Sequence, residues 1–262
     1  MFHFVLAVLL GAAQPMDLPV SDAARSVVML HAPQNASNPQ AGTGFLVQLP
    51  GALFLVTAEH VARGIGANAQ VTFGAAGDVA QTVSLADLAG SAPPAWVFHG
   101  QADVAVIALH GRTNLLSNLA SRGLQPAHLV SSLEAPARDR PLTVFGFPLG
   151  LGGLTLGPDH RISPLSRESR AASGLLTLQR ADTHTPANFY LLADPSVGGY
   201  SGAPVFMLSA PYFTGQSIGF GPPVGFCMGL VHGTVSDGTG GKLAAIVPVA
   251  YITETIQEAF RH

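Results

Sequence analysis

The chain has 262 residues, of which 48% are hydrophobic and 10% charged, so it can fill a sizeable core and is not expected to be disordered. Its formal net charge of −3 argues against a nucleic-acid-binding protein, which usually carries a clustered basic surplus. The 30 glycines and 20 prolines are scattered along the chain, as expected for many short strands joined by turns.

The N-terminal segment, residues 1–13, has the length and apolar character of a signal peptide, and residues 11–13 are small enough for a cleavage point. No Lys or Arg precedes the apolar run, so a short N-terminal apolar strand is the alternative. The run is too short to span a bilayer, and no later segment has transmembrane character, so stable membrane insertion is not expected. With a signal peptide the protein would be exported, to the periplasm or beyond, and without one it would be cytoplasmic.

Short apolar runs of strand length recur along the chain on both sides of a Pro-containing, charged stretch at residues 126–140. Before it they lie at residues 26–30, 43–47, 53–57, 69–73, 80–85 and 104–109. After it they lie at residues 142–146, 175–179, 189–193, 205–207, 224–231 and 243–247. Only residues 249–260 show the spacing of an amphipathic helix. This pattern predicts an all-β barrel or sandwich fold in two halves.

Three side chains with catalytic chemistry stand where apolar runs meet loops. His60 follows the run LFLVT, Asp103 precedes VAVIAL, and Ser201 lies in GGYSGAPV. Each residue alone has a structural interpretation as a strand end, a cap or a tight turn. Together they supply a nucleophile, a base and an acid that orients the base. Their order along the chain differs from the Ser-first order of α/β-hydrolases and the Asp-first order of subtilisin-type enzymes.

These segments resemble motifs of the chymotrypsin/trypsin-like serine peptidases. TAEHVA is similar to their TAAHC-type segment, ADVAVIAL to their DIALL segment and GGYSGAPV to their GDSGGPV segment. The upstream GTGFLV resembles the GSGFVV strand of bacterial HtrA-like and related trypsin-like peptidases, although no stretch remains for a PDZ-type domain. The similarity spans nearly the whole chain.

The resemblance implies an all-β fold of two packed antiparallel six-stranded β-barrels with a C-terminal helix and an active site between the barrels. The N-terminal barrel would occupy residues 22–125, the connection residues 126–140, the second barrel residues 141–248 and the helix residues 249–262. The oligomeric state does not follow from the sequence.

The same resemblance implies a role for each matching residue. His60 would be the general base, Asp103 its orienting carboxylate and Ser201 the nucleophile, with the backbone N–H groups of Gly199 and Ser201 forming an oxyanion hole. The implied reaction is hydrolysis of a peptide bond in a protein or peptide substrate through an acyl-enzyme, without a cofactor or metal.

Two departures from the family pattern are informative. Tyr200 stands where trypsin-type zymogens carry an Asp that pairs with a newly cut N-terminus, so we expect activity without such cleavage.

The positions that match the walls and base of the substrate pocket in the family are Pro195, Ser196, Val231, His232 and Gly233. None of them is acidic, although Asp194 lies next to Pro195, so a small or medium apolar P1 residue is expected. His232 aligns with a Ser that contacts the buried Asp, and a contact with Asp103, a contact with substrate and a purely structural role all stay open.

Other chemistry finds little support in the residues. The single cysteine, Cys227, lies in an apolar run and is interpreted as a buried small side chain. The Gly-rich stretch 146–153 lacks the ending of a phosphate loop and is interpreted as a loop near the substrate cleft. The ten histidines show no HExxH or Cys/His spacing for a metal. Two alternatives to a peptidase remain, a catalytically latent peptide-binding module and an esterase that uses the same triad.

Overall fold

The computed structural model describes residues 18–33, 40–129, 132–153, 160–208, 211–213, 218–220, 225–236 and 239–261. The expected signal peptide at residues 1–13 lies outside the described residues. Among the helices within the described ranges, none is both long enough and apolar enough to cross a membrane.

The first half of the chain forms a seven-stranded antiparallel sheet in the order β5-β4-β1-β2-β3-β7-β6. Its strands are β1 (Val27–His31), β2 (Ala41–Leu49), β3 (Ala52–Thr57), β4 (Gln70–Gly74), β5 (Ala80–Ser84), β6 (Val97–Phe98) and β7 (Ala105–Leu109). A two-residue turn of Pro50 and Gly51 joins β2 to β3, and the glycine φ of 82° supplies the left-handed position that such a turn requires. The apolar strands β2 and β3 bury Phe45 and Phe54 in the core.

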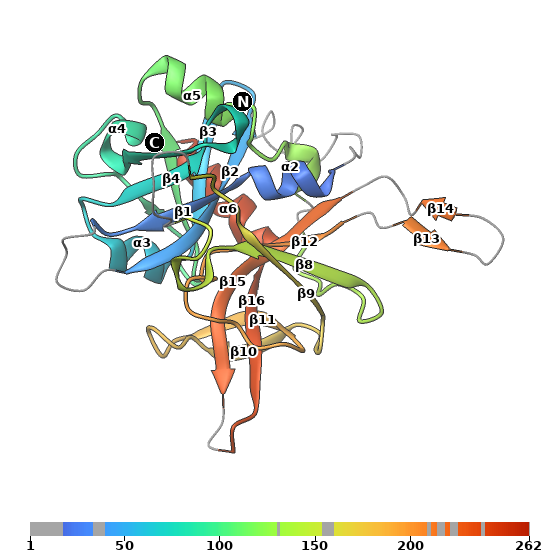
Figure 1. Cartoon of the computed structure of the whole chain (residues 1–262). Coiled ribbons are helices and arrows are strands. Elements are labelled where there is room, and N and C mark those ends of the chain that lie inside the picture. Colours follow the sequence, from blue (N-terminus) through green and yellow to red (C-terminus); the bar gives the residue numbers. More distant parts are fainter. Residues whose placement is uncertain are drawn as a thin grey trace.

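The second half forms another seven-stranded antiparallel sheet in the order β10-β11-β16-β15-β12-β8-β9. Its strands are β8 (Pro141–Gly146), β9 (Leu165–Arg170), β10 (Leu176–Gln179), β11 (Pro186–Leu192), β12 (Pro204–Met207), β15 (Phe226–Ser236) and β16 (Lys242–Pro248). Strands β13 (Pro211–Phe213) and β14 (Ile218–Phe220) pair separately and extend from the body, as Figure 1 shows.

The predicted all-β class is confirmed, but each sheet has seven strands where six were expected. Strand β9 reads LSRESR and was missed because it contains one apolar residue, which gives no hydrophobic run. Strand β6 has two residues, fewer than a periodicity can reveal.

The expectation that only the C-terminal segment is helical is wrong. The structure also contains α2 (Val20–Arg25), α3 (Glu59–Ile65), α4 (Leu85–Ala89) and α5 (Thr113–Ala120), and the 3-10 turns η1 (Ala76–Asp78), η2 (Pro126–His128) and η3 (Pro148–Gly150). None of these helices exceeds eight residues, too few to establish a helical repeat of apolar side chains.

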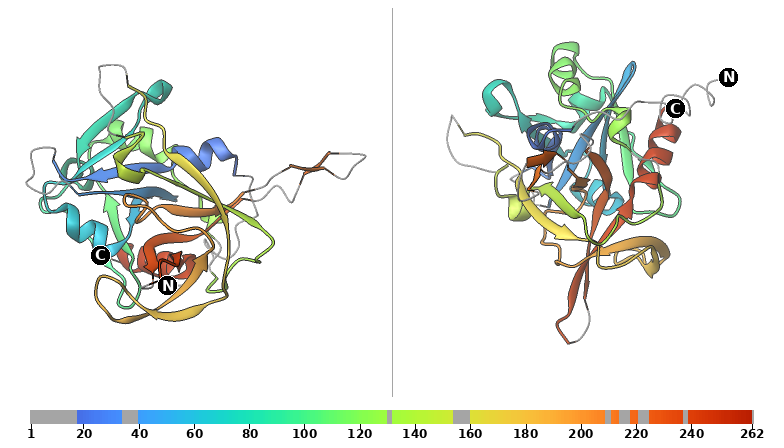
Figure 2. Two further views of the ribbon diagram at one scale, coloured as in Figure 1. Left: turned by 60° about the horizontal axis from the view of Figure 1, so that its bottom comes forward. Right: turned by 90° about the vertical axis from the view of Figure 1, so that its right-hand side faces the viewer.

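The predicted C-terminal helix is present as α6 (Val249–Ala259) and joins the two halves of the protein. It follows β16 of the second sheet and packs against β6 and β7 of the first sheet as well as β15. The two turned views of Figure 2 show this helix against the body of the molecule. Its Glu254 Oε2 lies 3.0 Å from His99 Nε2, and the backbone N–H of Ala102 donates to His99 Nδ1 at 2.9 Å. The helix therefore supports the loop that leads into Asp103.

Candidate active site

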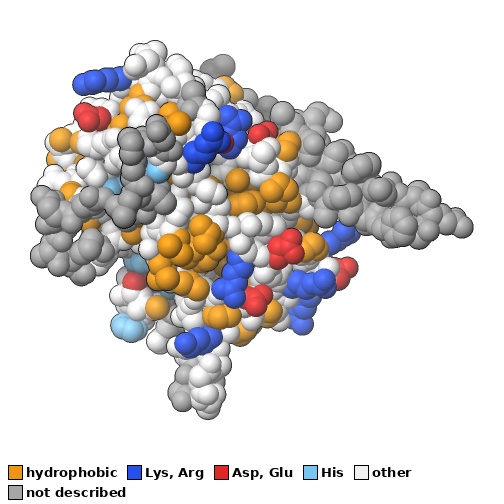
Figure 3. Space-filling model, in the orientation of Figure 1, with side chains coloured by type: hydrophobic (Ala, Val, Ile, Leu, Met, Phe, Trp, Pro, Cys, Tyr) orange, Lys and Arg blue, Asp and Glu red, His pale blue; other side chains and the backbone are white. Residues whose placement is uncertain are grey.

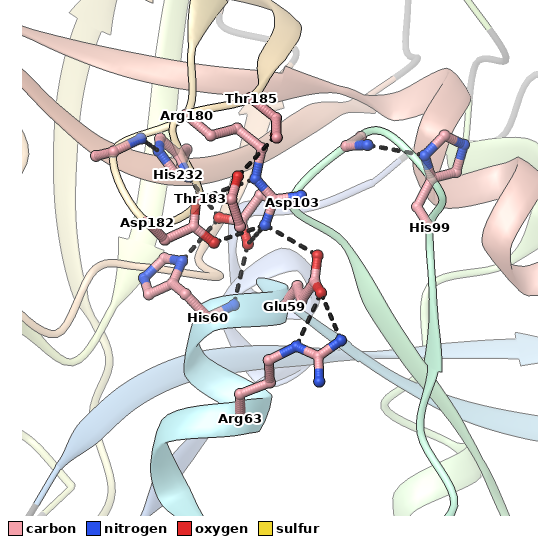
Figure 4. Close-up of polar contacts among 12 residues, drawn as sticks. Glu59, His60, Arg63, His99, Asp103, Arg180, Asp182, Thr183, Thr185 and His232 are labelled. Carbon is pink, nitrogen blue, oxygen red and sulfur yellow. Dashed lines mark hydrogen bonds and ion pairs between the residues drawn. The ribbon is translucent and has the colours of Figure 1, made fainter.

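His60 lies in the first turn of α3, where the chain leaves strand β3. Its Nδ1 lies 2.7 Å from Oδ2 of Asp103, and its backbone N–H donates to Oδ1 of the same carboxylate at 3.0 Å (Figure 4). The carboxylate thus orients both the ring and the start of the helix. Because Nδ1 donates to the carboxylate, the lone pair of the ring stays on Nε2, the form that accepts a proton.

Asp103 is completely buried and also receives donors from the second half of the chain. His232 of β15 donates from Nδ1 to Asp103 Oδ2 at 2.5 Å, while the backbone N–H of Ala181 donates to His232 Nε2 at 3.1 Å. The two contacts together require a neutral ring that carries its proton on Nδ1. Arg180 adds a contact of 3.3 Å to Asp103 Oδ1. The His232 side chain therefore contacts Asp103 and is 5% exposed.

The electrostatics of the pair favour a charged carboxylate and an imidazole that holds a proton well. Burial of Asp103 opposes its charged form, but hydrogen bonds from His232 and His60 outweigh burial and hold the pKa of Asp103 far below its usual range. Burial likewise opposes charge on His60, yet the hydrogen bond and the negative charge of Asp103 raise the pKa of His60 above its usual value.

Ser201 lies at the junction of the two sheets, just before strand β12. Its carbonyl accepts the backbone N–H of Thr43 from β2 at 2.9 Å, and the next amide, of Gly202, donates to Val231 of β15 at 2.8 Å. The Ser201 hydroxyl donates to the carbonyl of His232 at 3.2 Å. Among the contacts of the described residues there is no direct hydrogen bond between Ser201 and His60. The structure thus joins His60, Asp103 and His232 directly, and Ser201 through the His232 backbone.

The loop before Ser201 passes so close to the stretch 147–149 that only glycine fits at position 199. Gly199 has a φ of 98°, and a Cβ there would lie 2.4 Å from the carbonyl oxygen of Phe147. The neighbouring carbonyl of Gly198 accepts the N–H of Leu149 at 2.7 Å. The Gly-rich stretch therefore lies beside this loop, as the sequence indicated. Leu149 itself, with its φ of 55°, was not singled out by the sequence pattern.

Two backbone amides of this loop are held so that their N–H groups are free. In a trans peptide the N–H points away from the C=O. The carbonyl of Gly198 is bound to Leu149, and the carbonyl of Tyr200 accepts the N–H of Ala203 at 2.8 Å. These bonds fix the orientation of the amides of Gly199 and Ser201, which donate no hydrogen bond within the described part of the chain.

Of the five residues expected to shape the substrate pocket, three line one cavity, whereas His232 and Gly233 are not among its lining residues. Pro195, Ser196 and Val231 line one cavity of about 20 Å³, enough for roughly one water molecule. Thr234 follows Gly233 on β15, and its hydroxyl donates to the carbonyl of Ser196 at 3.0 Å. This hydrogen bond joins strand β15 to the segment that contains Pro195 and Ser196.

Asp194, adjacent to the expected pocket base, also lines this cavity. The guanidinium of Arg167 donates to the carbonyl of Pro195 at 2.6 Å and lies 3.7 Å from a carboxylate oxygen of Asp194. The acidic side chain therefore has a basic neighbour at the cavity, which weakens its attraction for a substrate cation.

The cluster of His60, Asp103 and His232 is the one group within the described residues whose ligand atoms converge closely enough for a metal ion. A metal would need the lone pair of His232 Nδ1, but the Ala181 amide on Nε2 requires that Nδ1 carry the proton. The hydrogen bonds to Asp103 therefore fit the cluster better than a metal does.

Two further residues from the sequence analysis, Cys227 and Tyr200, are buried. Cys227 is completely buried, and burial raises the pKa of its thiol to about 12, so it is not a nucleophile. Tyr200 is buried, and its hydroxyl lies 3.4 Å from the carbonyl of Leu165, so no charge is available there for a terminal amine.

Comparisons with known proteins identify the family of the chain and structures with a similar fold. The Trypsin-like peptidase domain family matches residues 42–210, more than half of the chain. No curated protein matches. The solved structure of the Rv3671c protease from M. tuberculosis, in its active form, is similar with a TM-score of 0.53 and 16% identity over 93% of this chain and 88% of that one. The apo MamO protease domain from Magnetospirillum magneticum is similar with a TM-score of 0.52 and 15% identity over 89% of this chain and 96% of that one. The chain therefore belongs to the trypsin-like peptidase domain family.

Proposed function

We propose that the protein is a serine endopeptidase in which Ser201 is the nucleophile, His60 the general base and Asp103 the carboxylate that orients the base. The observation that carries the proposal is the 2.7 Å contact from His60 Nδ1 to Asp103 Oδ2, which leaves His60 Nε2 free to accept a proton at the junction where Ser201 lies. The completely buried carboxylate stabilises the imidazolium that forms when His60 takes this proton.

The reaction begins when the Ser201 hydroxyl turns from the carbonyl of His232 towards His60 Nε2. Its oxygen attacks the peptide carbonyl carbon as the proton passes to His60, and the amides of Gly199 and Ser201 donate to the resulting oxyanion. His60 then gives the proton to the leaving amine, the C–N bond breaks, and an ester on Ser201 remains. Water attacks this ester with His60 as base, which releases the acid and restores the hydroxyl.

The cavity beside Ser196 and Val231 supports a substrate with a small or medium apolar P1 residue. Its volume of about 20 Å³ leaves little room for a long side chain. The guanidinium of Arg167 lies beside the Asp194 carboxylate that lines the cavity and offsets its charge, so a basic P1 residue gains little there.

The charge distribution on one face of the molecule also fits a protein or peptide substrate better than a nucleic acid. On the face shown in Figure 3, basic and acidic side chains are interspersed, with hydrophobic side chains between them. A nucleic-acid footprint would instead gather basic side chains in a patch or stripe.

The first test is covalent labelling with a fluorophosphonate probe, read by intact mass, on the wild type and on the Ser201→Ala and His60→Ala variants. One adduct on the wild type and none on either variant supports an activated Ser201. A peptide library would then define the P1 preference, with cleavage after alanine or valine expected to exceed cleavage after arginine. Turnover of small esters without cleavage of any peptide would favour an esterase.

A latent binding module is the second candidate, and one observation favours it. The Ser201 hydroxyl donates to the His232 carbonyl, as an unengaged nucleophile would. A folded wild-type protein that takes no fluorophosphonate label yet binds peptides would support this candidate over the peptidase.

A further inference from the structure

The turn between β10 and β11, residues 180–185, places a buried arginine on the proposed catalytic carboxylate. Arg180 is 4% exposed, and its Nη2 lies 3.3 Å from Asp103 Oδ1, the oxygen that also accepts the backbone N–H of His60. Figure 4 shows the contacts that join the Arg180 guanidinium to Asp103 and to Glu59 of helix α3. The two histidines bind the other oxygen, Oδ2, at 2.7 Å and 2.5 Å. Both oxygens of the carboxylate are therefore held by two donors.

The guanidinium is itself fixed from two further sides. Asp182, in the same turn, binds it through both carboxylate oxygens, at 3.0 Å to Nε and 2.6 Å to Nη2. Glu59, the helix residue that precedes His60, accepts from Nη2 at 2.9 Å. A bidentate carboxylate contact gives a guanidinium one defined orientation, which a flexible ammonium group would lack.

The turn that carries Arg180 is also well ordered by its own backbone. The N–H of Arg180 donates to the carbonyl of Thr185 at 2.9 Å, and the N–H of His184 donates back to the carbonyl of Arg180 at 3.0 Å. The next residue, Ala181, gives its N–H to His232. A single turn of the second sheet thus supports two of the groups that hold Asp103, one through a side chain and one through the backbone.

We propose that Arg180 is a positioning residue of the active site, whose buried guanidinium holds Asp103 in place and ties it, together with helix α3, to the β10–β11 turn. This inference rests on the proposed function for its catalytic meaning. The contact between Arg180 and Asp103 also predicts how the pKa of His60 responds to substitution, and this can be measured without turnover. The cation of Arg180 lies near His60 and opposes the imidazolium form, whereas the carboxylate of Asp182 favours it.

The charged and titratable groups around His60 come from four elements. Asp103 precedes β7, Arg180 and Asp182 belong to the β10–β11 turn, Glu59 and Arg63 belong to α3, and neutral His232 comes from β15. Arg63 pairs with Glu59 at 2.8 Å, but its side chain is 60% exposed. Arg63→Met is therefore a matched control, because it removes a cation bound to the same Glu59 without touching Asp103.

The test is an NMR titration of the full-length protein, with the His60 resonance assigned by its loss in His60→Ala. Arg180→Met is expected to move the His60 midpoint to higher pH, because a nearby positive charge is lost. Asp182→Asn is expected to move it to lower pH, because a negative charge is lost. Arg180→Lys is expected to stay closer to wild type than Arg180→Met, and Arg63→Met is expected to cause a smaller change than either turn variant. A guanidinium and a carboxylate whose charges do not act on the His60–Asp103 pair would not produce shifts of opposite sign.

Equal midpoints in Arg180→Met and Arg63→Met, or shifts of the same sign in Arg180→Met and Asp182→Asn, would overturn the inference. If Arg180→Met does not fold, Arg180→Lys and Asp182→Asn decide the question, and an unchanged midpoint in Asp182→Asn counts against it. Fluorophosphonate labelling of the same samples separates the two proposals. An unlabelled wild type with the predicted shifts would reject the peptidase and retain the Arg180 contact.

Discussion

Thr43 links the first sheet to the loop that carries Gly199, and replacing it by valine tests whether this link holds the proposed oxyanion hole. Its buried hydroxyl donates to the carbonyl of Gly199 at 2.7 Å and accepts the N–H of Phe147 at 3.0 Å. Valine has nearly the same shape but leaves both groups without this partner. At about 1–3 kcal/mol for each orphaned group, and with Gly199 partly open to water, we expect the free energy of unfolding to fall by about 3 kcal/mol.

The same change should slow covalent labelling of Ser201. Removing one oxyanion donor from a hydrolase lowers the rate on the order of 100-fold to 1000-fold. A loosened loop keeps the Gly199 donor but positions it less well, so we expect the labelling rate to fall by roughly tenfold to 100-fold. The assays are urea unfolding and the second-order rate of fluorophosphonate labelling. Thr43→Ser keeps the hydroxyl and should label at a rate near that of the wild type.

A second control separates the loop from general stability. Thr72 on β4 is equally buried, and its hydroxyl contacts His31 Nε2 at 3.0 Å and Thr82 at 2.8 Å, within the first sheet. Thr72→Val should lower stability without slowing labelling beyond what the unfolded fraction explains. Labelling of Thr43→Val at the wild-type rate would refute the reasoning, because the loop would then keep its geometry without the hydroxyl.

Three further predictions concern buried groups. Asp103→Asn should reduce the rate of fluorophosphonate labelling by roughly 10⁴-fold, because either orientation of the amide turns its NH₂ group towards donors. Labelling of this variant at more than about a tenth of the wild-type rate, after subtraction of the Ser201→Ala background, would contradict the prediction. The free energy of unfolding should fall as the pH drops below about 4, because the pKa of Asp103 is lower in the folded state than in the unfolded state. The stability that Asp103 contributes is complete above its unfolded-state pKa and is lost as the pH falls towards its folded-state pKa. Urea unfolding between about pH 2 and pH 5 should show a shallower pH dependence for Asp103→Asn than for the wild type, and equal slopes would count against the assignment. Cys227 should resist alkylation in the native protein near pH 8 and react in urea, since burial raises its pKa to about 12, and rapid native labelling read by intact mass would disprove its burial.

Much of the fold was predictable because most strands of the two sheets are local runs of apolar residues. Strands such as β3 and β7 are nearly continuous apolar segments, and the Pro50-Gly51 pair predicts the turn of the hairpin between β2 and β3. Strand β9 and the short helices were missed for the opposite reason. Their conformation depends on the neighbouring strands and loops against which they pack, and local periodicity carries little of that information.

The sequence by itself determined the family resemblance and singled out His60, Asp103 and Ser201, since each lies in a short motif of its own. Only the tertiary structure decided how these residues are supported. Arg180 lies 77 positions from Asp103, and Thr43 lies 156 positions from Gly199. Arg180 lies in no motif, because an arginine after a strand is an ordinary choice. Thr43 lies in the GTGFLV motif, but that motif does not indicate its contact with Gly199. Their roles arise only where the two sheets meet, since burial there makes each hydrogen bond and charge depend on residues from the other half of the chain.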